Sequence, residues 1–170
     1  LRLKEIWDTP NCKDFDRYRS PEMLTAIGDA GVVVLVSNWK AAAAPFVVET
    51  INRIKGLSSA SIVLVGPKQF GDIDIRALLK MSMEERVAYR NISDTEIIKL
   101  NKRLQTIEQA IYVDIIGALC DHDGNCPQVT ESGRLISQDG GHLTPAGALL
   151  LGDRLEQEME ISKILGLATN

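Results

Sequence analysis

The sequence predicts an α/β fold in which helices cover both faces of a parallel sheet, forming a three-layer sandwich. Three observations lead to this prediction. Short apolar runs alternate along the chain with amphipathic stretches, 45% of the 170 residues are apolar, and no internal repeat breaks the alternation. A chain of this size can bury a substantial core, and we expect residues 1–170 to form a single domain.

The first elements of the predicted sheet lie between residues 31 and 67. The continuous β-branched run GVVVLVS at 31–37 indicates a strand that is buried on both faces. The amphipathic stretch at 44–56 predicts a helix that ends at Gly56. SIVLVGP at 61–67 predicts a second buried strand, which the Gly-Pro pair stops.

Helical segments then flank a third strand, predicted for AIYVDI at 110–115. Residues 72–91 indicate helix in short pieces, and Ser93 with Glu96 predicts a capping box for a longer amphipathic helix. Residues 117–141 are rich in Gly, Asp, Asn and Ser, so we expect an ordered loop there.

Two further helix starts complete the pattern. Ser20 with Pro21 predicts a short helix, and Thr144 with Pro145 predicts a longer one, because proline suits the first helical position. In parallel sheets the chemistry gathers at the carboxyl ends of the strands. The segments SNWK and GPKQFG, which follow the first two predicted strands, are therefore the first places to look for a site.

Charge and hydropathy argue against two classes of protein. The net charge is -4 and the lysines and arginines are scattered, so there is no basic footprint for nucleic acid. No apolar run approaches the roughly 20 residues of a membrane-spanning helix. The chain begins on Leu1 and shows neither a signal peptide nor a tag, so we expect it to be part of something longer.

The three cysteines bear on the cellular compartment. Cys120 and Cys126 flank the turn-forming run DHDGN, so they can close a small disulfide loop in an oxidising compartment. This arrangement favours an extracytoplasmic location, whereas in the cytosol the pair would be incidental. Cys12 is then left over, either buried as a small apolar residue or paired with a cysteine elsewhere.

The segment SQDGGHLTPAG at 137–147 contains one of only two histidines in the chain. A histidine that acts as a general base needs its second ring nitrogen held by an acceptor. Asp139 lies three residues before His142, and two glycines let the backbone turn between them. The alternative is an exposed loop in which Asp139 caps a turn and His142 is solvated. We expect a hydrogen bond between the two side chains.

With the small-residue helix that follows, this segment resembles the last conserved block of the SGNH hydrolases, also called GDSL-type esterases. The sequence is more similar still to the SGNH domains attached to membrane O-acyltransferases of the acyltransferase-3 type. Those domains carry a cysteine pair in the loop before the block, as in LCDHDGNCPQVTESGRLISQDGGHLTPAGA. VVVLVSNWK resembles their third block, and the resemblance covers most of residues 30–155.

The resemblance implies a flavodoxin-like parallel sheet and a serine esterase or O-acyltransferase. Such an enzyme moves a short acyl group, commonly acetyl, to or from a hydroxyl of a surface polysaccharide through an acyl-enzyme. The implied partners are an acylated glycan and an attached transmembrane acyltransferase domain, and the implied location is the periplasm or cell surface. The chemistry needs no metal and no dissociable cofactor.

The same resemblance implies roles for three residues of this chain. His142 would activate the serine, Asp139 would orient His142, and Asn38 would donate to the oxyanion. Trp39 is a separate candidate, since a tryptophan at the end of this strand can stack on a sugar face. The alternatives are that Asn38 caps the following helix and that Trp39 is buried at the strand end.

This chain departs from the family pattern at the nucleophile. The family places it in a Gly-Asp-Ser block at the end of the first strand, and this chain has no such block. GDA at 28–30 precedes a strand, whereas the nucleophile turn must run from strand to helix. We expect the first strand and its serine to lie upstream, so that the sheet has either an exposed apolar edge or a partner segment in that place. The alternative is a non-catalytic glycan-binding or structural module.

The loop DHDGN is not expected to bind a metal. Asp121, Asp123 and Asn125 have the spacing of the first ligands of a calcium loop, but Ser132 replaces the glutamate at the twelfth position. His122 is interpreted as a solvated turn residue, because the only further zinc ligands nearby are the two cysteines.

Overall fold

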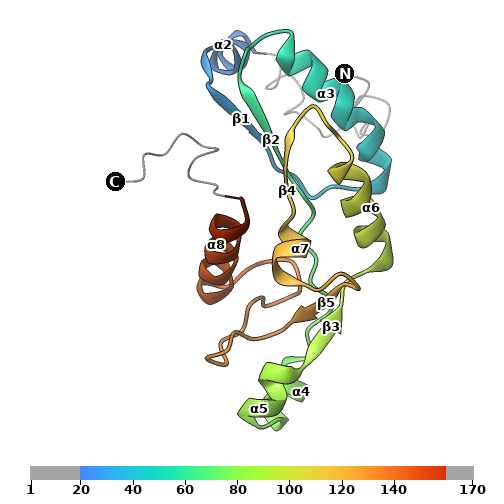
Figure 1. Ribbon diagram of the computed structural model, residues 1–170, viewed down its shortest axis with the longest axis vertical. Coiled ribbons are helices and arrows are strands. Elements are labelled where there is room, and N and C mark those ends of the chain that lie inside the picture. The colour runs from blue at the N-terminus through green and yellow to red at the C-terminus, as the bar shows by residue number, and fades with distance from the viewer. Residues whose placement is uncertain (1–19, 160–170) are drawn as a thin grey trace.

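A computed structural model of the chain describes residues 20–159, and Cys12 therefore lies outside the described residues (Figure 1). The strands are β1 (Val32–Leu35), β2 (Ser61–Val65), β3 (Arg90–Ile92), β4 (Ile111–Val113) and β5 (Asn125–Pro127). The helices are α2 (Pro21–Asp29), the 3-10 turn η2 (Ala41–Ala43), α3 (Ala44–Lys55), α4 (Ile75–Lys80), α5 (Met83–Ala88), α6 (Thr95–Gln105), α7 (Ile115–Leu119) and α8 (Pro145–Met159).

The main sheet is parallel and has the strand order β1-β2-β4. Its strands coincide with the three predicted runs, and the register pairs Val32 with Ser61 and Val63 with Ile111. Each run is short and β-branched, which suits a strand covered on both faces. The predicted parallel α/β architecture is confirmed.

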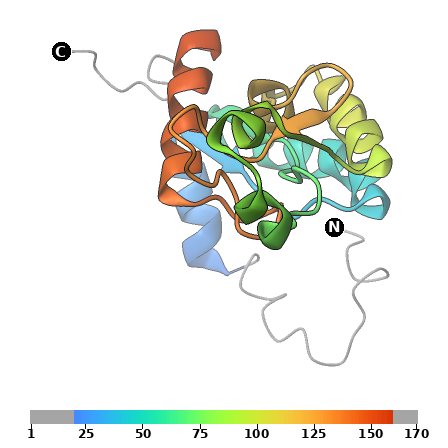
Figure 2. The same ribbon diagram turned by 90° about the horizontal axis from the view of Figure 1, so that it is seen from below.

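Two apolar clusters cover the two faces of this sheet. Ile62 and Leu64 point to one face, where they pack against α3 and α6 through residues such as Ile51 and Leu104. Val63 points to the other face and joins a cluster with α7 and α8. Figure 2 shows α3 and α6, in cyan and yellow, across the sheet from the red α8. The three layers are therefore confirmed.

The free side of β1 is the incomplete part of the sheet. Val34 is the register partner of Val63 and lies on the same face, yet Val34 is 47% exposed and Val63 only 3%. Val36, just beyond the strand, is exposed as well. Within residues 20–159 no strand pairs with this side of β1. The predicted exposed apolar edge is therefore present.

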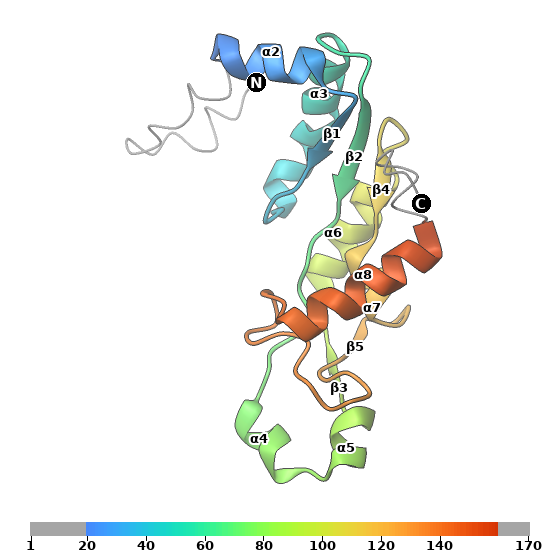
Figure 3. The ribbon, with the colours of Figure 1, turned by 90° about the vertical axis from the view of Figure 1, so that its left-hand side faces the viewer.

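The segment predicted as a loop at 117–141 contains more structure than expected. It begins in α7, and its β5 strand forms an antiparallel pair with β3. These elements were missed because each has five residues or fewer and shows no helical or strand period. The short helices α4 and α5, expected from the mixed pattern of 72–91, project beyond this pair at one end of the molecule (Figure 3).

The helix caps were predicted with one error. Ser20 caps α2 by accepting the N–H of Met23 at 3.2 Å, and the Thr144 hydroxyl accepts the N–H of Gly147 at 3.1 Å in α8. The Ser93–Glu96 capping box is wrong, because Asp94 caps α6 through its 2.7 Å bond from the N–H of Glu96. Ser93 is instead buried, and its hydroxyl donates to the backbone carbonyl of Gln69.

In the part of the chain that the structure describes, no helix has the length and apolar character needed to cross a membrane.

The predicted disulfide between Cys120 and Cys126 is present, and it joins the C-terminal end of α7 to β5. Both cysteines are buried in the cluster beneath α7 and α8. The bridge fixes the antiparallel β3–β5 pair to α7, which follows directly after β4 of the main sheet. It thereby anchors the start of the long segment that leads to α8.

Removing this disulfide should lower the stability of the protein. The bridge closes a loop with a sequence separation of 6, and the loss of that constraint on the unfolded chain costs about 2 kcal/mol. We expect Cys120→Ala/Cys126→Ala to melt several degrees below the wild type. Alkylation without reductant, followed by mass spectrometry, should leave Cys120 and Cys126 unlabelled. Labelling of both would contradict the pairing.

Candidate active site

The side chains of Asp139 and His142 are joined in the loop that precedes α8. His142 Nδ1 lies 2.6 Å from Asp139 Oδ2. The other carboxylate oxygen, Oδ1, accepts the backbone N–H of Gly141 at 3.0 Å and that of His142 at 2.7 Å. The expected hydrogen bond is present, and the same carboxylate also caps the turn. One aspartate therefore fixes both the loop and the ring.

This contact sets what the His142 ring can do. A carboxylate that accepts from Nδ1 favours the tautomer with its proton on that nitrogen, which leaves Nε2 as the basic atom. Within residues 20–159 the ring is hydrogen-bonded to Asp139 alone, and the His142 side chain is 80% exposed. The imidazole is thus oriented and open on the side where a general base would act.

Hydrogen bonds fix both ends of residues 137–144, the dyad loop, which carries the Asp139–His142 pair (the dyad). The buried Ser137 hydroxyl donates to the carbonyl of His142 at 2.8 Å, and the N–H of Gln138 donates to the same oxygen at 3.2 Å. The Thr144 hydroxyl donates to the carbonyl of Leu135. Since Thr144 also begins α8, these bonds fix the loop to the start of the helix.

Gly140 brings the dyad loop against the loop that follows β2. Its carbonyl accepts the N–H of Phe70 at 2.7 Å. Its φ is +81°, and a Cβ added there would overlap the carbonyl oxygen of Gly71. Glycine is required on both counts, because other residues rarely adopt this φ and none could approach the backbone so closely.

Two buried polar side chains fix the backbone of residues 66–71, the loop that follows β2 (the β2 loop). The Ser93 hydroxyl donates to the carbonyl of Gln69 at 2.6 Å. Gln128 donates through Nε2 to the carbonyls of Phe70 at 3.2 Å and Cys126 at 3.1 Å. Both side chains are 1% exposed. Sequence reasoning missed their role, since a single serine or glutamine in a polar segment gives no periodic signal.

A further buried network lies where β2 and β4 end. The Tyr112 hydroxyl donates to Asn101 Oδ1 at 2.5 Å, and Asn101 Nδ2 donates to Asp114 at 2.9 Å. Burial, and then the charge of Asp114, raises the pKa of Tyr112 well above its usual range. Gly66 lies so close that an added Cβ would overlap the Tyr112 hydroxyl. The network ties α6 to the carboxyl end of the sheet.

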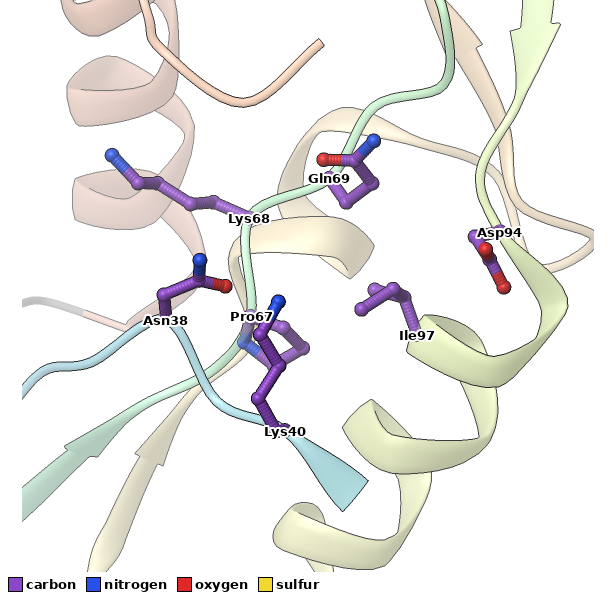
Figure 4. Close-up of a pocket in the computed structure, with 7 residues that line it drawn as sticks. All are labelled: Asn38, Lys40, Pro67, Lys68, Gln69, Asp94 and Ile97. Atoms are coloured by element: carbon purple, nitrogen blue, oxygen red, sulfur yellow. The ribbon is translucent and has the colours of Figure 1, made fainter. Parts of the chain in front are cut away.

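A pocket of about 260 Å³ opens at this end of the sheet (Figure 4). Its lining comes from the segments that follow β1 and β2 and from the start of α6, namely Asn38, Lys40, Pro67, Lys68, Gln69, Asp94 and Ile97. Both post-strand segments that the sequence singled out, SNWK and GPKQFG, therefore contribute side chains to this pocket.

Asn38 and Trp39 take different places. Asn38 lines the pocket and is exposed. It does not cap a helix, because η2 and α3 begin after Lys40 and Ala43 without any side-chain cap. Trp39 packs against the cluster under α3 and α6, and its indole donates to the carbonyl of Val65 at 2.7 Å. The structure thus gives Trp39 a packing role at the strand end, and its expected sugar-stacking role stays a prediction.

Gln69 connects the pocket with the dyad loop. Its side chain lines the pocket, and its Oε1 lies 3.5 Å from where a Cβ would stand on Gly141. His142 and Asp139 do not line the pocket themselves. Gln69 thus reaches both the pocket and the loop that carries the dyad.

The DHDGN loop has the character predicted for it. The Asp121 carboxylate accepts the backbone N–H of Asp123 at 3.0 Å and that of Asn125 at 2.9 Å. His122 is exposed and lies 3.3 Å from the carboxylate of Asp123. The aspartate thus organises a turn, and His122 is a solvated turn residue.

Replacing Gly140 should disturb the dyad loop. We expect Gly140→Ala to lower the free energy of unfolding by about 2 kcal/mol, because the methyl group would force the two loops apart. Gly152→Ala is a matched control: it lies in α8, and an added Cβ meets no described atom within 4 Å. That control should be neutral or slightly stabilising. Chemical denaturation of both variants makes the comparison, and equal stabilities would contradict the close approach.

The dyad should also give the stability a pH dependence. The hydrogen bond from His142, then the backbone N–H groups of His142 and Gly141, hold the pKa of Asp139 well below its usual range. The folded chain then binds fewer protons than the unfolded chain, so this stabilisation is present above about pH 4 and is lost below it. The melting-temperature difference between wild type and Asp139→Asn should shrink as pH falls below about 4. A difference that grows in acid would contradict this.

Comparison with known proteins agrees with the fold described above. Among solved structures, the periplasmic domain of the lipopolysaccharide acetyltransferase of Salmonella ser. Paratyphi A aligns with a TM-score of 0.58 and 19% sequence identity. The alignment covers 82% of this chain and 61% of that one. At this identity the likeness concerns the fold.

Sequence comparison adds the family. A search of curated protein sequences gave no significant match. The family described as the SGNH domain (fused to AT3 domains) matches residues 2–157, which include both dyad residues and the pocket. The chain therefore belongs to the family of SGNH domains that are fused to AT3 domains.

Proposed function

We propose that this chain is an SGNH-type catalytic domain, spanning residues 1–170, of a longer esterase or O-acyltransferase. Its substrates are short acyl esters, commonly acetyl esters, of cell-surface carbohydrate. The observation that carries the proposal is the bond between His142 and Asp139 in a loop fixed at the carboxyl end of the sheet. Membership of a family fused to acyltransferase domains supports it.

The nucleophile would come from a segment that this chain does not contain. Within residues 20–159, Val34 is exposed and no strand pairs with the free side of β1, and this surface offers a place for a further strand and helix. A strand added there would end at the same edge of the sheet as Asn38, because the strands of the sheet run parallel. A serine at its end would then lie near the pocket.

The residues of this chain have defined parts in such a reaction. The serine hydroxyl attacks the acyl carbon while His142 Nε2 takes its proton, and Asp139 stabilises the imidazolium. Asn38 donates a hydrogen bond to the oxyanion. His142 returns the proton to the departing group, and an acyl-enzyme remains. A sugar hydroxyl or water, deprotonated by His142, attacks this ester and regenerates the serine.

Location and partners follow from two observations. A disulfide is typical of proteins outside the reducing cytosol, and the structural neighbour is a periplasmic domain. We infer an extracytoplasmic domain tethered to a membrane-embedded acyltransferase domain that supplies the acyl group. The partner at the site is the carbohydrate.

The alternative is a glycan-binding or structural module without catalysis. It is favoured by one observation, the lack of a Gly-Asp-Ser block in these residues. The coding sequence upstream of Leu1 separates the two, since catalysis requires a serine at the end of a strand there.

The proposed function predicts that the full-length protein hydrolyses p-nitrophenyl acetate. His142→Ala should reduce kcat/KM by about 10²- to 10⁴-fold, because it removes the general base. His122→Ala is the matched control, since it deletes the other, exposed histidine, and should leave the rate unchanged. Asn38→Ala should lower kcat by about 10²-fold with little change in melting temperature. Hydrolysis that survives His142→Ala would contradict the proposal.

A further inference from the structure

Two lysines stand at the pocket beside the dyad loop. Lys40 follows β1 and Lys68 follows β2, and both line the pocket. In Figure 4 the Lys40 ammonium group points toward the middle of the pocket, and Lys68 extends outward past Asn38. Within the described residues neither lysine forms an ion pair. Their charges are therefore available to a ligand.

The pocket has the opposite charge to the chain. Its lining holds two ammonium groups and one carboxylate, Asp94, which gives a net charge of +1, whereas the whole chain carries -4. The Asp94 carboxylate is engaged as the cap of α6, where the helix dipole offsets its charge. A small basic concavity on an acidic protein attracts anions selectively.

The other lining residues suit a sugar ring. The buried Pro67 and the half-buried Ile97 supply apolar surface against which the C–H groups of a ring can pack. The amides of Asn38 and Gln69 supply donors and acceptors for hydroxyl groups. At about 260 Å³ the pocket is smaller than the roughly 300–1,000 Å³ typical of drug-sized ligands, so it holds a single ring.

We propose that this pocket binds a sugar residue that bears an anionic group, a carboxylate or a phosphate, and that Lys40 and Lys68 recognise the charge. The inference rests on the proposed function, because it assigns the class of glycan presented to the dyad. Gln69, which lines the pocket and faces the dyad loop, then places the bound sugar next to His142.

Binding measured without turnover tests the proposal. Calorimetric titration of the full-length protein at low salt compares methyl glucuronide, glucose 6-phosphate and the neutral methyl glucoside. At least one of the two anionic sugars should bind tenfold or more tightly than the glucoside, and the preference should fall as salt screens the lysines. Which anion binds better distinguishes a carboxylated from a phosphorylated glycan.

Variants locate the binding. Lys40→Gln and Lys68→Gln should each weaken the preference about threefold, and the double variant should abolish it. Lys55→Gln, an exposed lysine at the end of α3, is the matched control and should keep the full preference. Equal binding of charged and neutral sugars by the wild type, or a preference that survives in the double variant, overturns the proposal.

The outcome is separable from that of the proposed function. His142→Ala should retain the preference for anionic sugars, since this side chain does not line the pocket. Loss of ester hydrolysis with retained preference would leave the pocket assignment standing. Hydrolysis without any preference would overturn the pocket assignment alone.

Discussion

The candidate site depends on one backbone contact, in which the N–H of Phe70 donates to the carbonyl of Gly140. It joins two segments that are 70 residues apart in the numbering, the loop after β2 and the loop that carries Asp139 and His142. The Gly140 φ of +81° lets the two backbones meet without a side chain between them. Without this contact the dyad would still form, but its loop would lose the direct backbone bond to the segment that follows β2.

Buried side chains and the disulfide hold the Phe70 side of this contact in place. Ser93 and Gln128 bind consecutive carbonyls of the β2 loop, and Gln128 also binds the carbonyl of Cys126. The disulfide then fixes Cys126 to the end of α7. A buried loop must satisfy its backbone polar groups internally. These two side chains do so here, and they link the disulfide to the dyad through bonds to the main chain.

What the sequence predicted correctly was local. Asp139 and His142 lie three positions apart, the disulfide closes a short loop, and the three strands of the main sheet are apolar runs, so each of these signals lies within one segment. The error, and the contacts that sequence reasoning missed, concern positions whose surroundings are set by distant segments. Ser93 has the residue type and spacing of a cap, but its hydroxyl donates to the carbonyl of Gln69 in the β2 loop. The indole N–H of Trp39 likewise donates to the carbonyl of Val65, a partner that no local pattern indicates.

The strength of the Asp139–His142 interaction depends on how much water reaches the two side chains. The side chains of His142 and Asp139 are 80% and 55% exposed, so water screens the attraction between them. A segment packed over Val34 and ending beside the pocket would exclude part of that water, and a bound sugar would exclude more. The same hydrogen bond would then hold the imidazolium more strongly, because electrostatic interactions strengthen as water leaves a site. In the proposed reaction, the preformed geometry of the dyad is the contribution of the described residues, and a further packed segment and the substrate would add the desolvation.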